Sequence, residues 1–415
     1  MHPFEAFVLR NYVQHAVLGS DRPISRPPKR CSEAIAAWLE TYGESLGLPR
    51  CKTLDEEPFD IASSRKVNGA DWLALQPAIL KLRAKKTVPR LSPLEKRLTW
   101  LGSTLALTDA ECAILKLMAR ARIDQSIHEL GLVICSADKC FGLGSSNKGE
   151  VQLDAIATMV GLPVDGVRKL LSKNHSLLAL GLLEDTGHDD FMASGTVMGI
   201  ARLETTDPQL LHASLIGPSQ DAELSWDDFN HLGENRDMAR SLLAAATLSG
   251  EKGVNLLFYG PPGTGKTEFV RTLATHLSMQ AIFVGEHDDD NEEPNRASRI
   301  AAYALLRSLA GRAGNTLLVI DEADDIFTGV DEDDRNSRTG SKVFMNRLVE
   351  STEAPTIWIT NHPERLGPAV VRRMSMAMRF PVPTFPNRKR MVEAIAKRQA
   401  IILPEAEVEK LAKFP

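Results

Sequence analysis

The sequence predicts an α/β fold, a three-layer sandwich around a parallel sheet, preceded by a mainly α-helical N-terminal domain with a winged-helix-like unit. In the C-terminal half, an apolar run from Val254 to Tyr259 leads into a glycine-rich loop and a helix, and a second apolar run ends in two acids. Such alternation of strands and helices is typical of parallel sheets. Upstream, a helical pattern starts at Ser92, where apolar residues recur three and four positions apart.

Residues 260–267 read Gly-Pro-Pro-Gly-Thr-Gly-Lys-Thr and predict a P-loop for ATP. Such a loop bends backbone N–H groups around an anion, and the following helix adds partial positive charge at its N-terminus. Gly260, Gly263 and Gly265 permit the close backbone path. Lys266 can reach the terminal phosphates, and Thr267 can offer its hydroxyl to Mg²⁺. The predicted nucleotide-binding set also includes Pro261, Pro262, Thr264 and Glu268.

The apolar run Thr316–Ile320 suits a strand buried on both faces of a parallel sheet, and it ends in Asp321 and Glu322. Ligands of open α/β sheets bind at the carboxyl ends of the strands, so these acids are expected beside the loop. There Asp321 would support Mg²⁺ and Glu322 would act as general base toward the attacking water. The alternative is a pair of acids that caps the following helix.

Composition limits the class of protein. With 415 residues the chain is long enough for two or three domains, and a net charge of -5 lacks the basic excess of a dedicated nucleic-acid binder. No run reaches membrane-spanning length and the start lacks a signal-peptide pattern, so we expect no membrane contact and a cytoplasmic location. The cysteines are scattered and indicate a reducing compartment without disulfides or a zinc site; they are Cys31, Cys51, Cys112, Cys135 and Cys140.

Four regions are expected along the chain: helical segments and linkers in 1–90, a mainly helical adaptor in 91–225, the ATPase domain in 226–385, and the start of a helical lid in 386–415. The stretch from Arg22 to Arg30 is a proline-rich basic linker. Strands are expected at four places, namely Val254 to Tyr259, Gln280 to Val284, Thr316 to Ile320 and Thr356 to Thr360.

Residues Leu153 to Leu171 place a glycine turn between two short helices, as a helix-turn-helix does, and a β-rich tail is expected from Leu177 to about Leu203. This unit could read DNA as a winged helix. However, acids outnumber bases between Val151 and Thr205, whereas a recognition helix needs phosphate neutralisation on its flanks. The charge therefore favours a protein-contact or structural role over nucleic acid.

With these motifs in order, residues 226 to 415 resemble the AAA clade of the AAA+ ATPases. The resemblance implies that Asn361 is the sensor-1 residue, which orients the attacking water. It also implies that Arg372 is the arginine finger, acting in a neighbouring subunit. Arg373 is a second candidate, since the family's second arginine is missing near Ser375. Taken singly, the asparagine could cap a helix and the arginines could form surface ion pairs.

The stretch before the P-loop resembles the family segment that borders adenine, which implies roles for Leu232 and Gly233, although His231 stands where the family prefers aspartate. Three departures from the family matter. The loop Gly285–Pro294 is acidic and lacks the aromatic residue of polypeptide-threading members, and Val330–Gly340 is a second, highly charged loop. Most of the family's lid is absent from the sequence, so we expect this chain to bind ATP better than it hydrolyses it.

The first functional hypothesis is a ring ATPase, a homo-oligomer of six subunits, that remodels or unfolds a protein substrate or complex selected by its N-terminal region. The alternative is a DNA-associated regulatory ATPase whose helix-turn-helix unit binds nucleic acid. A third reading is a nucleotide-gated scaffold with negligible turnover, against which the Glu322, Asn361 and Arg372 set argues.

Overall fold

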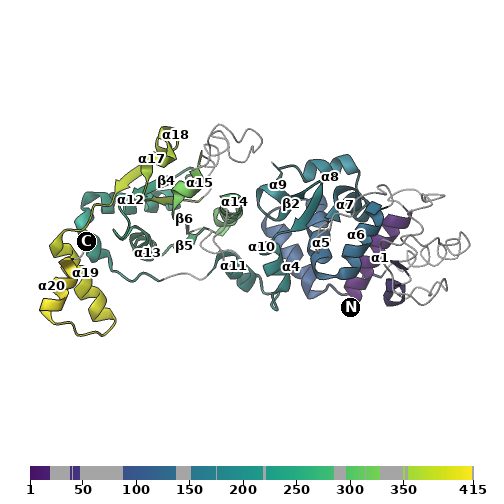
Figure 1. The fold of residues 1–415 in the computed structure, drawn as a ribbon, viewed down its shortest axis with the longest axis horizontal. Coiled ribbons are helices and arrows are strands. Elements are labelled where there is room, and N and C mark those ends of the chain that lie inside the picture. The colour runs from purple at the N-terminus through teal and green to yellow at the C-terminus, as the bar shows by residue number, and fades with distance from the viewer. Residues whose placement is uncertain are drawn as a thin grey trace, which may run out of the picture. The chain divides into compact units, whose positions relative to one another are not determined.

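The computed structural model describes the chain in segments that form two compact units, Met1–His212 and Ala213–Pro415 (Figure 1). The described residues are 1–18, 38–39, 41–46, 87–136, 151–173, 175–217, 221–284, 296–313, 315–327, 349–350 and 354–413. Several sequence expectations lie outside these residues: the linker from Arg22 to Arg30, the two charged loops at 285–294 and 330–340, and Cys31, Cys51 and Cys140.

The first unit is built mainly from helices, as the sequence predicts. Its first helices are α1 (Pro3–Leu18), α4 (Pro93–Thr104), α5 (Asp109–Ile123) and α6 (Gln125–Ser136), with the short 3-10 helix η1 at Gly43–Leu46. Arg120 is only 2% exposed, and its guanidinium pairs with Glu5 and Glu95, each at 2.6 Å. These ion pairs join α5 to α1 and α4, and each buried charge has a partner of opposite sign.

A winged-helix-like unit follows. It contains β1 (Val151–Gln152), α7 (Leu153–Val160), α8 (Val164–Leu170), α9 (Ser176–Ala179), β2 (Leu183–Gly187) and β3 (Asp190–Ala193). The strands pair antiparallel in the order β1-β3-β2. Gly161 ends α7 in the left-handed conformation, with φ 73°, and makes the turn between the two helices. The helix-turn-helix is present where the sequence places it.

The β-rich tail expected up to Leu203 is wrong in part. After the hairpin, residues Gly195–Arg202 form helix α10, and α11 follows at Pro208–Ile216. Ser194 caps α10 by accepting a hydrogen bond from the backbone N–H of Val197. Val197, Ile200 and Ala201 are buried, and their spacing of three and four residues is that of a helix. The β-branched residues of this stretch had favoured a strand in the sequence-based prediction.

The second unit contains a five-stranded parallel sheet in the order β5-β6-β7-β4-β8. Its strands are β4 (Asn255–Tyr259), β5 (Gln280–Phe283), β6 (Thr316–Ile320), β7 (Thr356–Thr360) and β8 (Met376–Arg379). The first four match the expected strands within a residue at either end. The edge strand β8 was not predicted, because Met-Ala-Met-Arg has no β-branched residue and its apolar run, Met376 to Met378, is short.

Helices cover both faces of this sheet, which confirms the three-layer α/β fold. One face packs Leu256, Phe258 and their counterparts on neighbouring strands against η2 (Trp226–Leu232), α12 (Glu234–Ser249) and α13 (Lys266–His276). On the opposite face, the Trp358 ring lies 5.4 Å from the rings of Tyr303 and Phe327. Those two residues belong to α14 (Arg296–Ala313) and α15 (Ala323–Phe327). The alternation along each strand assigns successive side chains to opposite layers.

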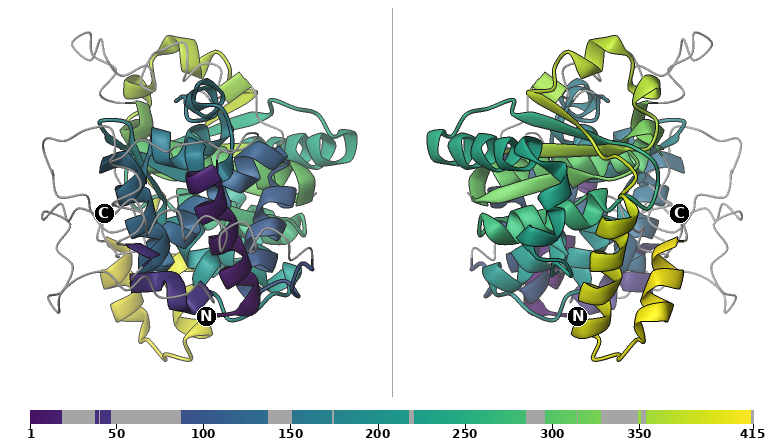
Figure 2. Two further views of the ribbon diagram at one scale, coloured as in Figure 1. Left: turned by 90° about the vertical axis from the view of Figure 1, so that its right-hand side faces the viewer. Right: turned by 90° about the vertical axis from the view of Figure 1, so that its left-hand side faces the viewer.

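Two short helices, α17 (Pro363–Leu366) and α18 (Pro368–Val371), connect β7 to β8. Helices α19 (Phe385–Arg398) and α20 (Glu405–Lys413) follow the sheet and pack side by side, drawn in yellow in Figure 2. In the part of the chain that the structure describes, no helix combines the length and apolar character needed to cross a membrane.

Candidate nucleotide site

The P-loop runs from the end of β4 to the first residue of α13. Gly260 has φ 150°, and a Cβ atom built there would lie 2.3 Å from the carbonyl oxygen of Phe380. No side chain fits in that space, so the first glycine is required by close packing against the chain beyond β8. At the other end, Gly265 has φ 82° and directly precedes Lys266, where α13 begins. The first N–H groups of α13 have no carbonyl partner within the helix and are available to an anion.

The Lys266 side chain lies under the loop and is 6% exposed. Its ammonium group donates hydrogen bonds to the carbonyl oxygens of Gly260 and Pro261 and to Oδ1 of Asn361, each at 2.8 Å. Burial lowers the pKa of Lys266, and the negative charge of Asp321 partly opposes that shift. The structure thus brings the predicted phosphate-binding lysine and the predicted sensor-1 residue into direct contact.

Thr267 and Asp321 come together at the point expected for the cation. The Thr267 hydroxyl donates a hydrogen bond to the Asp321 carboxylate, at 2.6 Å between Oγ1 and Oδ2. The two side chains offer oxygen atoms as metal ligands, which suits Mg²⁺. Among the described residues, no cluster of three or more histidine, cysteine or acidic side chains is present that could hold a metal. Two protein oxygens fit a Mg²⁺ ion that takes its other ligands from water and phosphate.

Glu322 follows Asp321 at the end of β6, with an exposed side chain. Its φ of 49° lies in the left-handed region, which is unfavourable by roughly 1–2 kcal/mol for a residue with a Cβ atom. Its backbone N–H donates to Oδ1 of Asp321 at 2.8 Å. The turn therefore sends the two neighbouring acids in different directions: Asp321 toward Thr267, and Glu322 into solvent at the carboxyl edge of the sheet.

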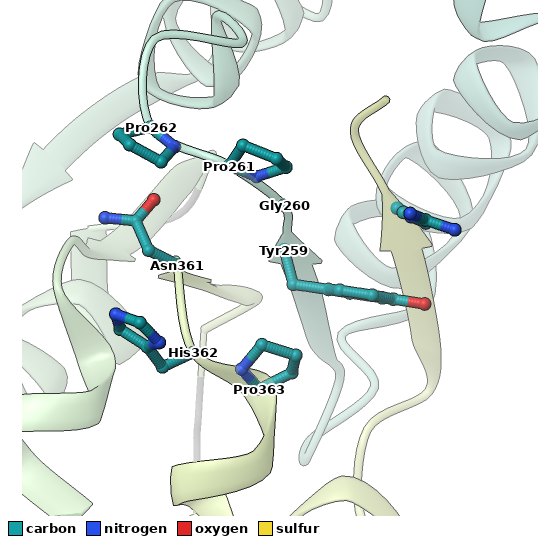
Figure 3. A pocket seen from close by; sticks show the side chains of 8 residues that line it. Tyr259, Gly260, Pro261, Pro262, Asn361, His362 and Pro363 are labelled. Carbon is teal, nitrogen blue, oxygen red and sulfur yellow. The ribbon is translucent and has the colours of Figure 1, made fainter. Parts of the chain in front are cut away.

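A cavity of about 530 Å³ opens beside the loop at the carboxyl ends of β4, β7 and β8. It is lined by Tyr259, Gly260, Pro261, Pro262, Asn361, His362, Pro363 and Arg379. Figure 3 shows the Asn361 side chain directed toward the segment that carries Pro261 and Pro262, while the Tyr259 ring extends away from it. Tyr259, His362 and Arg379 were not predicted as site residues, although their places at or next to strand ends could have suggested them.

The end of β7 is tied to the start of α15 by a second contact. The Thr360 hydroxyl donates to Asp324 at 2.7 Å, and Arg365 lies 3.5 Å from the other oxygen of that carboxylate. Asp324 is 7% exposed, and it was not predicted as a site residue. Thr360 precedes Asn361, and Asp324 follows Glu322 by two residues. The hydrogen bond between Thr360 and Asp324 therefore fixes the distance between the segment that carries Asn361 and the segment that carries Glu322.

The two arginines proposed for a finger differ in their surroundings. Arg373 pairs with Glu350 at 2.6 Å and donates to the carbonyl oxygen of Ala369 at 2.7 Å. Arg372 is exposed, and within the described segments its side chain has no hydrogen-bond or ion-pair partner. Nor does any such contact link Arg372 to the P-loop of its own chain. Of the two arginines, only Arg373 is therefore engaged by side-chain contacts within the described segments.

The residues expected near adenine are less directly placed. Leu232 is 7% exposed and belongs to the core, and Gly233 precedes α12. Phe229, which was not predicted, lies 3.6 Å from the position of a Cβ atom on Gly265 and so supports the loop from behind. The Glu268 carboxylate accepts hydrogen bonds from the backbone N–H groups of Glu223 and Leu224. Its side chain is thus engaged by the segment before η2, and the part of Glu268 that is left for the nucleotide is its backbone.

A parallel sheet with a glycine loop after one strand, a lysine and a threonine at the helix start, and acids after another strand defines a P-loop ATPase domain. Residues 256–382 match the model of the ATPase family associated with various cellular activities (AAA). The chain therefore carries an AAA domain of the AAA+ class, and ATP with Mg²⁺ is the ligand pair of its loop.

The chain is similar to a 26S proteasome regulatory subunit homolog of Methanocaldococcus jannaschii, with 32% identity over 157 residues, or 35% of this chain and 40% of the relative. It is 31% identical over 189 residues to ATPase family AAA domain-containing protein 3-B of Xenopus laevis, covering 43% of this chain and 30% of the relative. The match thus spans less than half of either relative. Among solved structures, a FIGL-1 AAA domain in complex with ADP matches with 18% identity, 49% and 72% coverage and a TM-score of 0.35.

Proposed function

We propose that this protein is a ring-forming ATPase, most simply a homohexamer, that uses ATP hydrolysis to remodel or unfold a protein substrate or complex. The single observation that supports a ring is Arg372, an exposed arginine whose side chain has no partner among the described residues and makes no contact with the P-loop of its own chain. Placed in a neighbouring site, a guanidinium stabilises charge on the transferring phosphoryl group. Relatives named as proteasome regulatory subunits are consistent with action on proteins.

The proposed chemistry assigns one task to each side chain. Lys266 and the N–H groups of the loop neutralise the phosphate oxygens, while Thr267 and Asp321 would hold Mg²⁺, which supplies further positive charge when bound. Glu322 accepts a proton from the attacking water. The oxygen of that water forms a bond to the γ-phosphorus, and the bond between the γ-phosphorus and the terminal oxygen of ADP breaks. Asn361 orients that water. Leu232 and Gly233 border the base.

The N-terminal unit is proposed to select the substrate. Its wing carries acids, including Glu184, Asp185 and Asp190, and Arg168 of α8 lies 3.5 Å from Asp189 at the tip of the hairpin. An acidic wing beside the second helix of the turn opposes a polyanion and favours a protein partner. The first compact unit, Met1–His212, contains helix α1 as well as most of the adaptor region that we propose at residues 91–225. We propose the ATPase domain at 226–385 and the lid helices from 386, in a reducing cytoplasmic compartment.

The ring is tested by ATP turnover as a function of protein concentration. Specific activity is expected to rise cooperatively with concentration, because each site is completed by a neighbour, and to be abolished in Lys266→Ala. Sedimentation over the same concentrations should show assembly in parallel with activity. Concentration-independent turnover by a monomer would contradict the ring.

The winged-helix geometry also permits the alternative of a DNA-linked switch, which makes a separate prediction. We expect the chain to show no salt-dependent binding to duplex DNA in fluorescence anisotropy, because acids outnumber bases in the winged-helix-like unit and Arg168 of its second helix lies beside Asp189. Arg168→Glu serves as the control and should leave the signal unchanged. Binding that weakens steeply with salt and is lost in Arg168→Glu would favour the DNA-associated regulator.

A further inference from the structure

The Arg299 side chain reaches from α14 to the turn that carries Asp321 and Glu322. Arg299 is buried, with 8% of its surface exposed. Its Nη2 donates to the carbonyl oxygen of Asp321. Its Nη1 lies 3.4 Å from the carbonyl oxygen of Glu322 and 3.4 Å from the Asp325 carboxylate. A guanidinium presents several donors in a rigid plane, so it can hold successive carbonyl groups in a fixed geometry, which the rotatable ammonium group of a lysine does less well.

This turn needs support from outside. Glu322 has a left-handed backbone, and residues other than glycine persist in that conformation where the surrounding structure determines it. The same Glu322 carbonyl accepts the backbone N–H of Asp325 at 3.1 Å, at the start of α15. The Arg299 contacts therefore join the strained residue, the strand before it and the helix after it. Two of these contacts act on the backbone and one on the Asp325 carboxylate, and none involves the Glu322 carboxylate.

We propose that Arg299 is a positioning residue for hydrolysis, one that fixes the backbone turn at Asp321 and Glu322 and thereby the direction of the Glu322 side chain. The proposal rests on the proposed ATPase function, because it assigns Arg299 to the geometry of the general base. Arg299 itself touches neither the loop nor the cavity beside it in the described structure. Nucleotide binding by the loop and Lys266 should therefore not depend on it.

Arg296 offers a matched control on the same helix. Its Nε donates to the carbonyl oxygen of Ile326 at 2.7 Å, so it also anchors α14 to α15 through a backbone carbonyl. This described contact lies near the end of α15 and does not involve the carbonyl groups of Asp321 and Glu322. A role of Arg299 in mere helix packing predicts equal effects for both arginines, whereas a role in the catalytic turn predicts an effect for Arg299 alone.

The test compares Arg299→Met, Arg299→Lys and Arg296→Met in the full chain, using kcat, KM and the dissociation constant of a fluorescent ATP analogue. We expect Arg299→Met to lower kcat about 10- to 100-fold, because small errors in the placement of a catalytic group have effects of that size. The dissociation constant of the ATP analogue should stay within about 3-fold of that of the unmutated chain, because a residue that acts only on the chemical step does not change ground-state binding. Arg299→Lys should recover part of kcat, and Arg296→Met should remain near the unmutated chain.

Hydrogen exchange across residues 316–327 gives a readout that does not depend on turnover. Amides at 321–325 should exchange faster in Arg299→Met and not in Arg296→Met. Unchanged kcat in Arg299→Met, equal losses in the two methionine variants, or a loss of binding in step with kcat would overturn the proposal. If the unmutated chain hydrolyses no ATP, the proposed function fails, and exchange alone then decides whether Arg299 holds the turn. If Arg299→Met does not fold, Arg299→Lys should still show a partial loss of kcat and faster exchange at 321–325 with an unchanged dissociation constant, and the absence of both effects would overturn the proposal.

Discussion

Replacing Arg372 with alanine is expected to lower kcat for ATP hydrolysis by about 10³-fold or more, the effect typical of an arginine finger. The reason is electrostatic: in the proposed ring the Arg372 guanidinium lies in the neighbouring site, where charge develops on the phosphoryl oxygens. Nucleotide affinity should change little, since Arg372 makes no contact with its own P-loop among the described residues. Steady-state turnover at a protein concentration that supports assembly measures the effect.

Arg373→Ala is the matched control, one residue away. Its guanidinium is already engaged by Glu350 and by the carbonyl oxygen of Ala369, so the expected result is a small loss of stability, about 0.5–1 kcal/mol for a partly exposed ion pair, with kcat nearly unchanged. A large loss of kcat in Arg373→Ala with normal activity in Arg372→Ala would assign the finger to Arg373. Normal activity in both variants would remove the shared-site mechanism.

Glu322→Gln is expected to lower kcat by about 10²- to 10⁴-fold, the range of general acid–base catalysis, while nucleotide binding is retained. The amide has the size of the carboxylate but cannot accept the proton of the attacking water. Because the side chain is exposed and the backbone turn is held by other groups, the melting temperature should not change. The measurement pairs single-turnover hydrolysis with the dissociation constant of ATP.

Glu364→Gln controls for the loss of a negative charge near the site. Glu364 is exposed and lies 3.1 Å from His362, which lines the cavity beside the loop. Its replacement should leave kcat close to that of the unmutated chain. An equal loss of activity in both glutamine variants would indicate a general charge effect and would contradict the role of Glu322 as the base.

The two inactive variants also test the shared site directly when they are mixed. Arg372→Ala subunits keep Glu322, and Glu322→Gln subunits keep Arg372, so an interface with the first as site and the second as donor contains both groups. With random mixing of equal amounts, about one interface in four of a head-to-tail ring has this arrangement. Recovered activity supports residues contributed by two subunits, and no recovery in a mixture shown to assemble opposes it.

Much of this protein could be predicted from the sequence because the relevant signals are local. The path of residues 260–267 depends on glycines at fixed positions and on the strand and helix that flank them, all visible in one stretch of chain. The same is true of Thr316–Ile320, whose apolar run predicts a buried strand and whose two acids follow at its carboxyl end. The helix α10 and strand β8 were missed because their local patterns are weak and their placement depends on packing.

Contacts between segments distant in sequence decided the rest. The motifs predict that Thr267 and Asp321 share a cation site, but no local pattern indicates that Lys266 donates a hydrogen bond to Asn361 or that Arg299 holds the turn at Glu322. Arg372 and Arg373 are indistinguishable as neighbours in sequence, and the difference arises because Glu350 happens to lie beside only one of them. By itself the sequence determined the parallel α/β fold and the chemical groups of the site. The tertiary structure decided which of those groups are engaged and which remain available, because hydrogen bonds and ion pairs depend on distances that only the packed sheet and helices set.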